Sequence, residues 1–147
     1  MEKEVLITIS GVQDEYEGPP ITQMVSGEYY LKNGRHYLLY NEVVEDMNGI
    51  LGNNKCTMKI SPEQVEITKK GDGNLYMNFM KGKKTLTSYN SPFGNIITGF
   101  YTHRIDIFEK EESMETVLYY ELEMNGAYIS ECEIRVQVKP RREQVSG

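Results

Sequence analysis

Hydrophobic and polar residues alternate along most of this chain, and almost no stretch has a helical period. In residues 116–124, for example, Leu118, Tyr120 and Leu122 alternate with positions that include Glu121 and Glu123. A period of two is typical of a strand with one buried face. The pattern predicts ten extended segments: residues 4–13, 22–32, 35–46, 55–61, 63–70, 74–81, 84–91, 95–109, 115–124 and 127–139.

The connections between these segments are short and rich in turn residues. Asn-Gly occurs at 33–34, 48–49 and 125–126, and Asp-Gly at 72–73. Because Asn-Gly readily adopts the positive φ angles of tight hairpins, these pairs predict consecutive antiparallel strands. The helical candidates are three short stretches, at 14–18, 61–64 and 109–114, and the last of them is equally explained by an exposed hairpin tip.

The last hairpin permits a prediction of register. Apolar positions are even-numbered on both of its strands, so one face of the pair should be even on both. A two-residue Asn125-Gly126 turn would pair even with odd positions, whereas a three-residue loop, 124–126, pairs even with even. We therefore expect the three-residue loop, with Leu118 opposite Cys132 and Tyr120 opposite Ser130.

A meander of this length has two exposed edges unless it closes, so the fold class we predict is an all-β, single antiparallel meander closed into a barrel of about 8–10 strands with little helix. The interior of such a barrel is either packed with side chains or holds one small ligand. A two-sheet sandwich is the main alternative. We expect one domain over residues 1–140 and a flexible tail over 141–147.

Composition narrows the possible partners. The chain has 147 residues and a net charge of −6, which disfavours nucleic acid as a partner. No apolar stretch approaches the ~20 residues of a membrane span, and no signal peptide is expected. Cys56 and Cys132 lie in strand-like segments and are predicted to be free, buried thiols in a reducing compartment, so a cytoplasmic location is expected.

Three sequence blocks resemble the YwiB-like bacterial β-barrel family. They are Tyr89-Asn90-Ser91-Pro92-Phe93-Gly94-Asn95, then Phe100-Tyr101-Thr102, and then residues 119–130, which read YYELEMNGAYIS. The resemblance covers nearly the whole chain and implies a fold similar to the calycins, the lipocalins and fatty-acid-binding proteins. This domain-of-unknown-function family carries no established activity, so the resemblance implies no catalytic residues.

The residues also give no sign of catalysis. His36 follows a turn and is expected at an exposed strand end, whereas His103 shares its strand parity with Ile105 and is expected in the core or barrel wall. Neither histidine is paired by spacing with a nucleophile. The two histidines and two cysteines fall in four different strands, which disfavours a zinc site, and no phosphate-binding glycine loop occurs. We therefore expect no enzyme activity, no cofactor and no metal.

The leading functional prediction is a small hydrophobic or anionic ligand inside the barrel. Arg104 shares its strand face with Phe100 and Thr102, and an interior arginine would need a partner such as Asp106 or a ligand carboxylate. A solvated Arg104–Asp106 pair on the outer wall is the alternative. The candidate interior ligand-binding residues are Phe100, Arg104, Tyr120 and Tyr128.

A second hypothesis is a protein-interaction module. Adjacent tyrosines on a strand send one ring inward and one outward, so one of Tyr29 and Tyr30, together with Tyr119, would be outward anchors. A homodimer is compatible with this hypothesis. An enzyme that uses carboxylates at the barrel mouth is the weakest of the three alternatives.

Overall fold

The computed structural model describes residues 3–13, 21–45, 48–71, 74–91 and 94–141, and in these residues the protein is all β with no helix. The strands begin and end within two residues of the predicted bounds, except that β4 starts at Leu51 rather than at residue 55. The predicted helical stretches 61–64 and 109–114 contain bends and strand ends, and residues 14–18 lie outside the described ranges. The strands are β1 (Glu4–Gln13), β2 (Ile21–Lys32), β3 (Arg35–Glu45), β4 (Leu51–Ile60), β5 (Gln64–Gly71), β6 (Leu75–Met80), β7 (Lys84–Ser91), β8 (Gly94–Glu109), β9 (Met114–Met124) and β10 (Ala127–Pro140).

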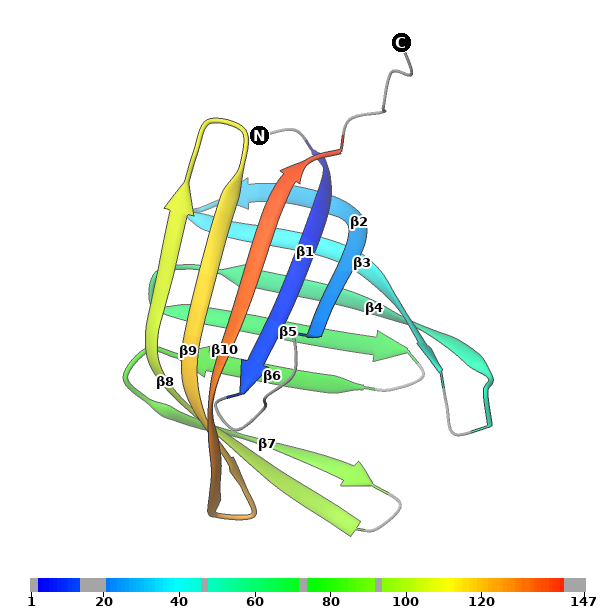
Figure 1. Ribbon diagram of the computed structural model, residues 1–147, viewed down its shortest axis with the longest axis vertical. Helices are drawn as coiled ribbons and strands as arrows, with labels where there is room; N and C mark the ends of the chain where they lie inside the picture. The colour runs from blue at the N-terminus through cyan, green and yellow to red at the C-terminus, as the bar shows by residue number, and fades with distance from the viewer. Residues whose placement is uncertain (1–2, 14–20, 46–47, 72–73, 92–93, 142–147) are drawn as a thin grey trace.

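All ten strands form one antiparallel sheet in the order β6-β5-β4-β3-β2-β1-β10-β9-β8-β7. The first and last strands are neighbours, with partners from Val5↔Pro140 to Gln13↔Cys132. The sheet curls so that β8, β9, β10 and β1 run along the long axis while β3–β6 cross behind them (Figure 1). One continuous sheet curled in this way is a nearly closed barrel and not a two-sheet sandwich.

The barrel closes between β6 and β7 without a regular ladder. The hydroxyl of Thr87 donates to the backbone carbonyl of Tyr76 at 2.7 Å, and the hydroxyl of Thr85 donates to the carbonyl of Asn78. These side-chain bonds satisfy carbonyls that an open sheet edge would leave exposed. We call these contacts the threonine seam.

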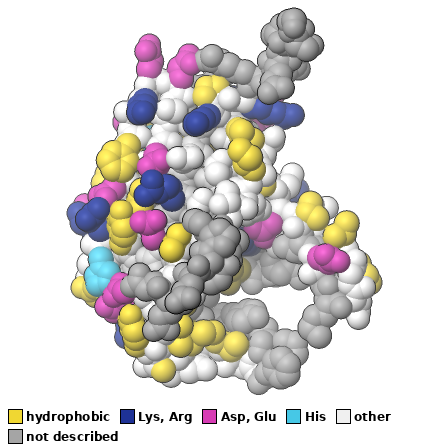
Figure 2. Space-filling view, viewed as in Figure 1, with side chains coloured by type: hydrophobic (Ala, Val, Ile, Leu, Met, Phe, Trp, Pro, Cys, Tyr) yellow, Lys and Arg dark blue, Asp and Glu magenta, His cyan; other side chains and the backbone are white. Residues whose placement is uncertain are grey.

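Alternation places the apolar residues of most strands inside the barrel. Phe79 is fully buried and packs against Phe100 and Tyr120, with ring centroids 4.7 and 4.9 Å away. Such tilted aromatic contacts stabilise the folded state by more than the burial of the rings alone would. Outside, charged side chains of both signs are interspersed with hydrophobic ones (Figure 2).

The predicted register of the last hairpin is wrong by two residues. Met124 pairs with Ala127, so the turn is the two-residue Asn125-Gly126 with φ angles of 51° and 83°. A register shift between Tyr128 and Ser130 then adds one residue to β10, and Leu118 faces Ile134. The bulge restores the expected even-with-even pairing that the turn alone would have broken.

A second bulge changes the inward-facing parity of β8. The register with β9 shifts between Thr102 and Arg104, which makes His103 the extra residue. Phe100 and Thr102 are buried before the bulge and Ile105 is buried after it, while His103 and Arg104 are both exposed. Even-numbered residues of β8 therefore face inward only before His103, which is why the prediction of an interior Arg104 fails.

Candidate functional site

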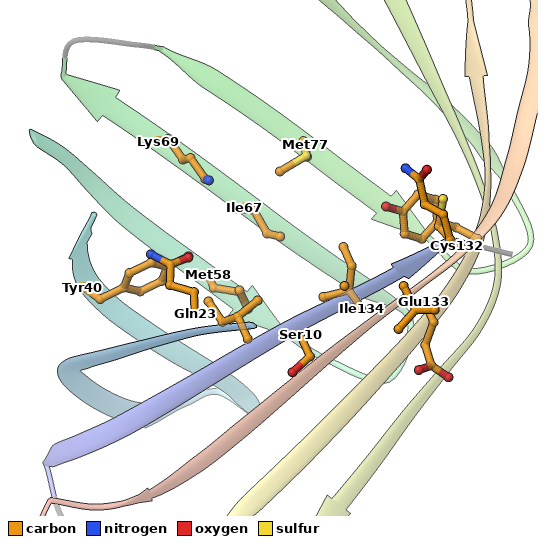
Figure 3. A pocket seen from close by; sticks show the side chains of 15 residues that line it. Ser10, Gln23, Tyr40, Met58, Ile67, Lys69, Met77, Cys132, Glu133 and Ile134 are labelled. Atoms are coloured by element: carbon orange, nitrogen blue, oxygen red, sulfur yellow. The ribbon is translucent and has the colours of Figure 1, made fainter. Parts of the chain in front are cut away.

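A cavity of about 400 Å³ lies between β1 and β10 on one side and strands of the β2–β6 side on the other (Figure 3). Its volume falls within the range of ligand pockets, which is roughly 300–1,000 Å³. Met58, Ile67 and Met77 supply much of its apolar wall, and methionine adapts well to ligands of different shape. Gln23 and Lys69 bring polar groups to the same cavity.

Lys69 on β5 is held by the carboxylate of Glu42 on β3. Its Nζ donates to Oε2 of Glu42 at 2.9 Å, and Glu42 is buried. Burial alone would raise the pKa of Glu42, but the hydrogen bond and charge of Lys69, with hydrogen bonds from Asn54 and Gln23, hold that pKa below its ordinary value. The cavity therefore has an ionised, hydrogen-bonded polar end.

Two tyrosine–cysteine pairs face the interior across neighbouring strands. Tyr40 is opposite Cys56, and Tyr120 is opposite Cys132. Burial raises the pKa of both tyrosines, with smaller contributions from the neighbouring cysteines. Both phenols therefore stay neutral. The two thiols are free and buried, as predicted.

Of the four predicted interior residues, two lie inside the barrel. Tyr120 lines the cavity, and Phe100 packs behind it with ring centroids 5.6 Å apart. Tyr128 is 59% exposed, so its predicted interior position is wrong. Tyr128 pairs with Glu123 before the β10 bulge, whereas the inward parity of that strand begins at Ser130.

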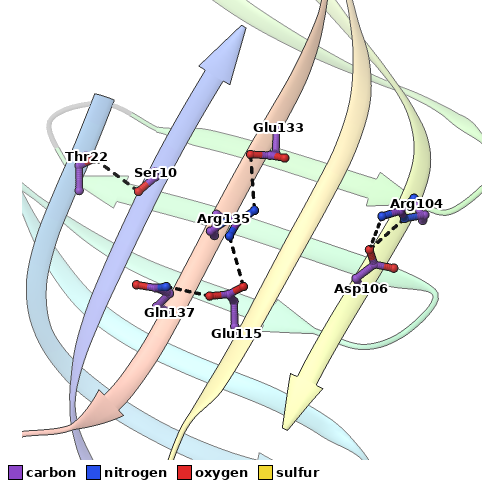
Figure 4. A network of polar contacts seen from close by, with 8 residues as sticks. All are labelled: Ser10, Thr22, Arg104, Asp106, Glu115, Glu133, Arg135 and Gln137. Atoms are coloured by element: carbon purple, nitrogen blue, oxygen red, sulfur yellow. Dashed lines mark hydrogen bonds and ion pairs between the residues drawn. The ribbon is translucent and has the colours of Figure 1, made fainter. Parts of the chain in front are cut away.

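The interior position predicted for Arg104 is also wrong, and the solvated alternative is confirmed. Its side chain is 61% exposed, and its guanidinium is 2.8 Å from Asp106 (Figure 4). The same guanidinium lies 4.5 Å from the ring centroid of Tyr119, a cation–π distance. The bulge at His103 turns Arg104 outward, and Arg104 takes no part in the cavity.

The exposed strand end predicted for His36 is wrong, whereas His103 lies on the barrel wall, one of the two positions predicted for it. His36 is buried, and its ring nitrogens contact the Tyr29 hydroxyl at 2.6 Å and Glu109 Oε1 at 2.7 Å. His103 lies on the outer face of that wall, 3.5 Å from carboxylates of Glu121 and Glu131. Neither histidine lines the cavity.

The polar end of the cavity was missed in the sequence, although a signal exists. Glu42 has the parity of the inward-facing Leu38 and Tyr40, and Lys69 has the parity of the buried Val65 and Ile67. A charged residue of each sign at an inward position on two nearby strands indicates a buried ion pair. Strand parity alone could therefore have nominated both residues.

The fold and the cavity define the class of this protein as a small up-and-down β-barrel with a partly polar interior. The chain belongs to the family described as "Domain of unknown function (DUF1934)", whose model matches residues 7–136. Within the described residues, no helix is long and apolar enough to cross a membrane.

A relative in Bacillus subtilis (strain 168) is described as "Uncharacterized beta-barrel protein YwiB". It is 26% identical over 125 residues, which is 83% of this chain and 84% of the relative. The crystal structure of the ywiB protein from Bacillus subtilis matches with a TM-score of 0.74 at 22% identity, covering 95% of this chain and 93% of the other. These similarities confirm the predicted family and the barrel.

Proposed function

We propose that this protein binds a small amphipathic molecule with an anionic group inside the barrel. The observation that carries the proposal is the Lys69–Glu42 pair at one part of an otherwise largely apolar cavity. Ligand pockets typically combine an apolar lining with a few placed polar groups that set orientation. The calycin likeness implied by the family resemblance is consistent with this role, although fold alone does not fix function.

In this proposal Lys69 recognises the anionic group. The ammonium of Lys69 has three N–H donors, so it can donate to a ligand carboxylate while it stays bonded to Glu42, which also accepts hydrogen bonds from Asn54 and Gln23. Gln23 and the neutral Tyr40 hydroxyl lie in the same lining and can donate further hydrogen bonds. The apolar part of the ligand then packs against Met58, Ile67 and Met77, and its burial drives binding.

The proposed role is binding and not catalysis. In the cavity lining the titratable groups include Lys69, which is already paired with Glu42, and tyrosines whose raised pKa keeps them protonated. A general base needs a pKa near the working pH, and burial raises the pKa of Tyr40 and Tyr120 away from that range.

The alternative of a protein-docking outer wall has less support. Tyr29 is buried, so Tyr30 and Tyr119 are the outward rings. Tyr30 already has the ammonium of Lys3 5.4 Å from its centroid and a hydrogen bond to Glu28, while Tyr119 is covered by Arg104. These contacts within the chain occupy the rings that would anchor a partner.

The first test compares octanoate with octanol in thermal unfolding. A ligand at 100 times its Kd stabilises the folded state by about 2.7 kcal/mol, which for a domain of this size raises Tm by roughly 5–10 °C. We expect octanoate to raise Tm more than octanol in the wild type. Lys69→Met should remove that difference, each shift being measured against the same variant without ligand.

Lys70→Met is the matched control. Lys70 is the next residue along β5 and is exposed, so its loss removes one positive charge without changing the cavity. Octanoate should therefore stabilise Lys70→Met as it does the wild type. Equal shifts for octanoate and octanol in the wild type, or a normal octanoate shift in Lys69→Met, would contradict the proposal.

A further inference from the structure

A histidine and two glutamates converge on the outer wall of the barrel, away from the cavity. They are His103 on β8, Glu121 on β9 and Glu131 on β10, and one donor atom from each lies within 4.8 Å of the other two. Three neighbouring strands thus supply one nitrogen and two carboxylate oxygens to one point. Neither glutamate nor His103 lines the cavity, so this cluster is independent of the proposed ligand site.

The spacing of these donors matches a metal site better than a set of direct hydrogen bonds. His103 Nε2 is 3.5 Å from Glu121 Oε1 and also 3.5 Å from Glu131 Oε2. Charge-assisted N–H···O bonds are shorter, about 2.7–2.9 Å. In tetrahedral zinc coordination, bonds of about 2.0–2.1 Å place neighbouring donor atoms about 3.3–3.4 Å apart. The two nitrogen–oxygen distances therefore fit two edges of such a site, while the two carboxylate oxygens lie within 4.8 Å of each other.

The pairing of the strands places two carboxylates side by side in the cluster. Glu121 and Glu131 are direct cross-strand partners, and like charges directly opposite each other destabilise a sheet. A divalent cation between them would neutralise both carboxylates and keep His103 as a neutral ligand.

The third donor, His103, shares the outward parity of the exposed Tyr101 on β8 and is the extra residue of the bulge in that strand. The ring of Tyr101 packs against His103 edge-to-face, with centroids 5.1 Å apart, and restricts the imidazole. The side chains of the three cluster residues are 37–42% exposed, so a water molecule has access to a fourth coordination position.

We propose that His103, Glu121 and Glu131 bind one divalent transition-metal ion on the outer wall. The mixed nitrogen and oxygen donors suit Zn²⁺, Co²⁺ or Cu²⁺ better than Mg²⁺ or Ca²⁺, which prefer oxygen ligands alone. The site has three protein ligands and an open position, an arrangement distinct from the closed four-ligand structural zinc sites.

Titration of the full, tag-free chain with Zn²⁺ in a calorimeter, and with Co²⁺ in a visible spectrometer, tests the site. We expect one ion per chain and a Co²⁺ spectrum of nitrogen and oxygen ligation, with excess Mg²⁺ failing to compete. His103→Gln and Glu131→Gln should each weaken Zn²⁺ binding at least tenfold. Both residues are partly exposed, and circular dichroism will verify that the variants fold.

Glu133→Gln is the matched control, because Glu133 lies two residues along β10 and faces Arg135 instead of the cluster (Figure 4). Its Zn²⁺ affinity should equal that of the wild type. Two results would overturn the proposal: no Zn²⁺ binding to the wild type, or undiminished binding in His103→Gln.

Discussion

At the scale of single residues, His36 shows how one buried polar side chain ties distant segments together. Its two ring nitrogens are both engaged, one by Tyr29 of the adjoining β2 and the other by Glu109 at the end of β8. Burial, with a smaller contribution from the charge of Glu109, raises the pKa of Tyr29. The phenol therefore stays protonated as a hydrogen-bond partner of the imidazole, and the contact of His36 with Glu109 joins the β2–β3 hairpin to the end of β8.

Replacing Tyr29 with phenylalanine tests this contact. The Tyr29→Phe variant keeps the ring but leaves one nitrogen of the buried His36 without its 2.6 Å partner. An unsatisfied buried polar group costs about 1–3 kcal/mol, so the free energy of unfolding in urea should fall by that amount. Tyr30→Phe is the control: Tyr30 is at the surface, and its loss should change stability by less than about 0.5 kcal/mol.

The ionised Glu42 predicts how stability changes with pH. Its pKa in the folded state is below the ordinary value of 4.5, so its contribution is fully present above that value and is lost as the pH falls through the folded pKa. The free-energy difference between the wild type and Glu42→Gln should therefore be largest at neutral pH and shrink below about pH 4.5. Urea unfolding at a series of pH values measures it, and a difference that grows on acidification would contradict this account.

At the scale of elements, the β9–β10 hairpin shows where sequence patterns suffice and where they fail. The strands were predicted closely because alternation and Asn-Gly turns are local signals. The register was not, because the turn and the bulge near Ile129 together determine it. Asn125 also bonds β8, its backbone N–H donating to the Ile97 carbonyl at 2.7 Å and its side-chain oxygen accepting from the Ile97 N–H at 3.0 Å. This long-range contact favours the two-residue turn and leaves no local trace in the sequence.

The turn itself can be tested with a glycine pair. Gly126 has a φ of +83°, and a Cβ added there would meet open space, so Gly126→Ala is costly only through its backbone conformation. We expect about 1–2 kcal/mol of destabilisation. Gly11→Ala is the control, since Gly11 also has open space but lies in extended β1, and its change should be neutral or slightly stabilising. Thermal unfolding of both variants separates backbone strain from packing.

At the scale of the whole molecule, closure depends on the threonine seam. β6 and β7 are the ends of the sheet, and the hydroxyls of Thr85 and Thr87 reach carbonyls of β6. Thr87→Val keeps the shape of the side chain and removes one bond, which should cost about 1 kcal/mol. Amide hydrogen exchange should then quicken in β6 and β7 and stay unchanged in β1 and β10; uniform quickening would show that the seam is not a separate unit.

The sequence predicted the barrel but only part of its interior site. Tyr120 and Phe100 were placed correctly because parity holds along β9 and up to the bulge in β8. Arg104 was placed inside because that parity was extended past His103, where the extra residue reverses it. Lys69 and Glu42 could not be told from solvated surface charges by residue type, although both have inward parity on their own strands.

The most direct test of the ligand cavity is methyl NMR of the methionines during titration with octanoate. Met58 and Met77 line the cavity, while Met24 is 64% exposed on the outside. Binding inside the barrel should shift the methyl signals of Met58 and Met77 in a saturable way and leave that of Met24 unchanged. Saturable shifts confined to Met24, or no shift at Met58 and Met77, would contradict a ligand site inside this barrel.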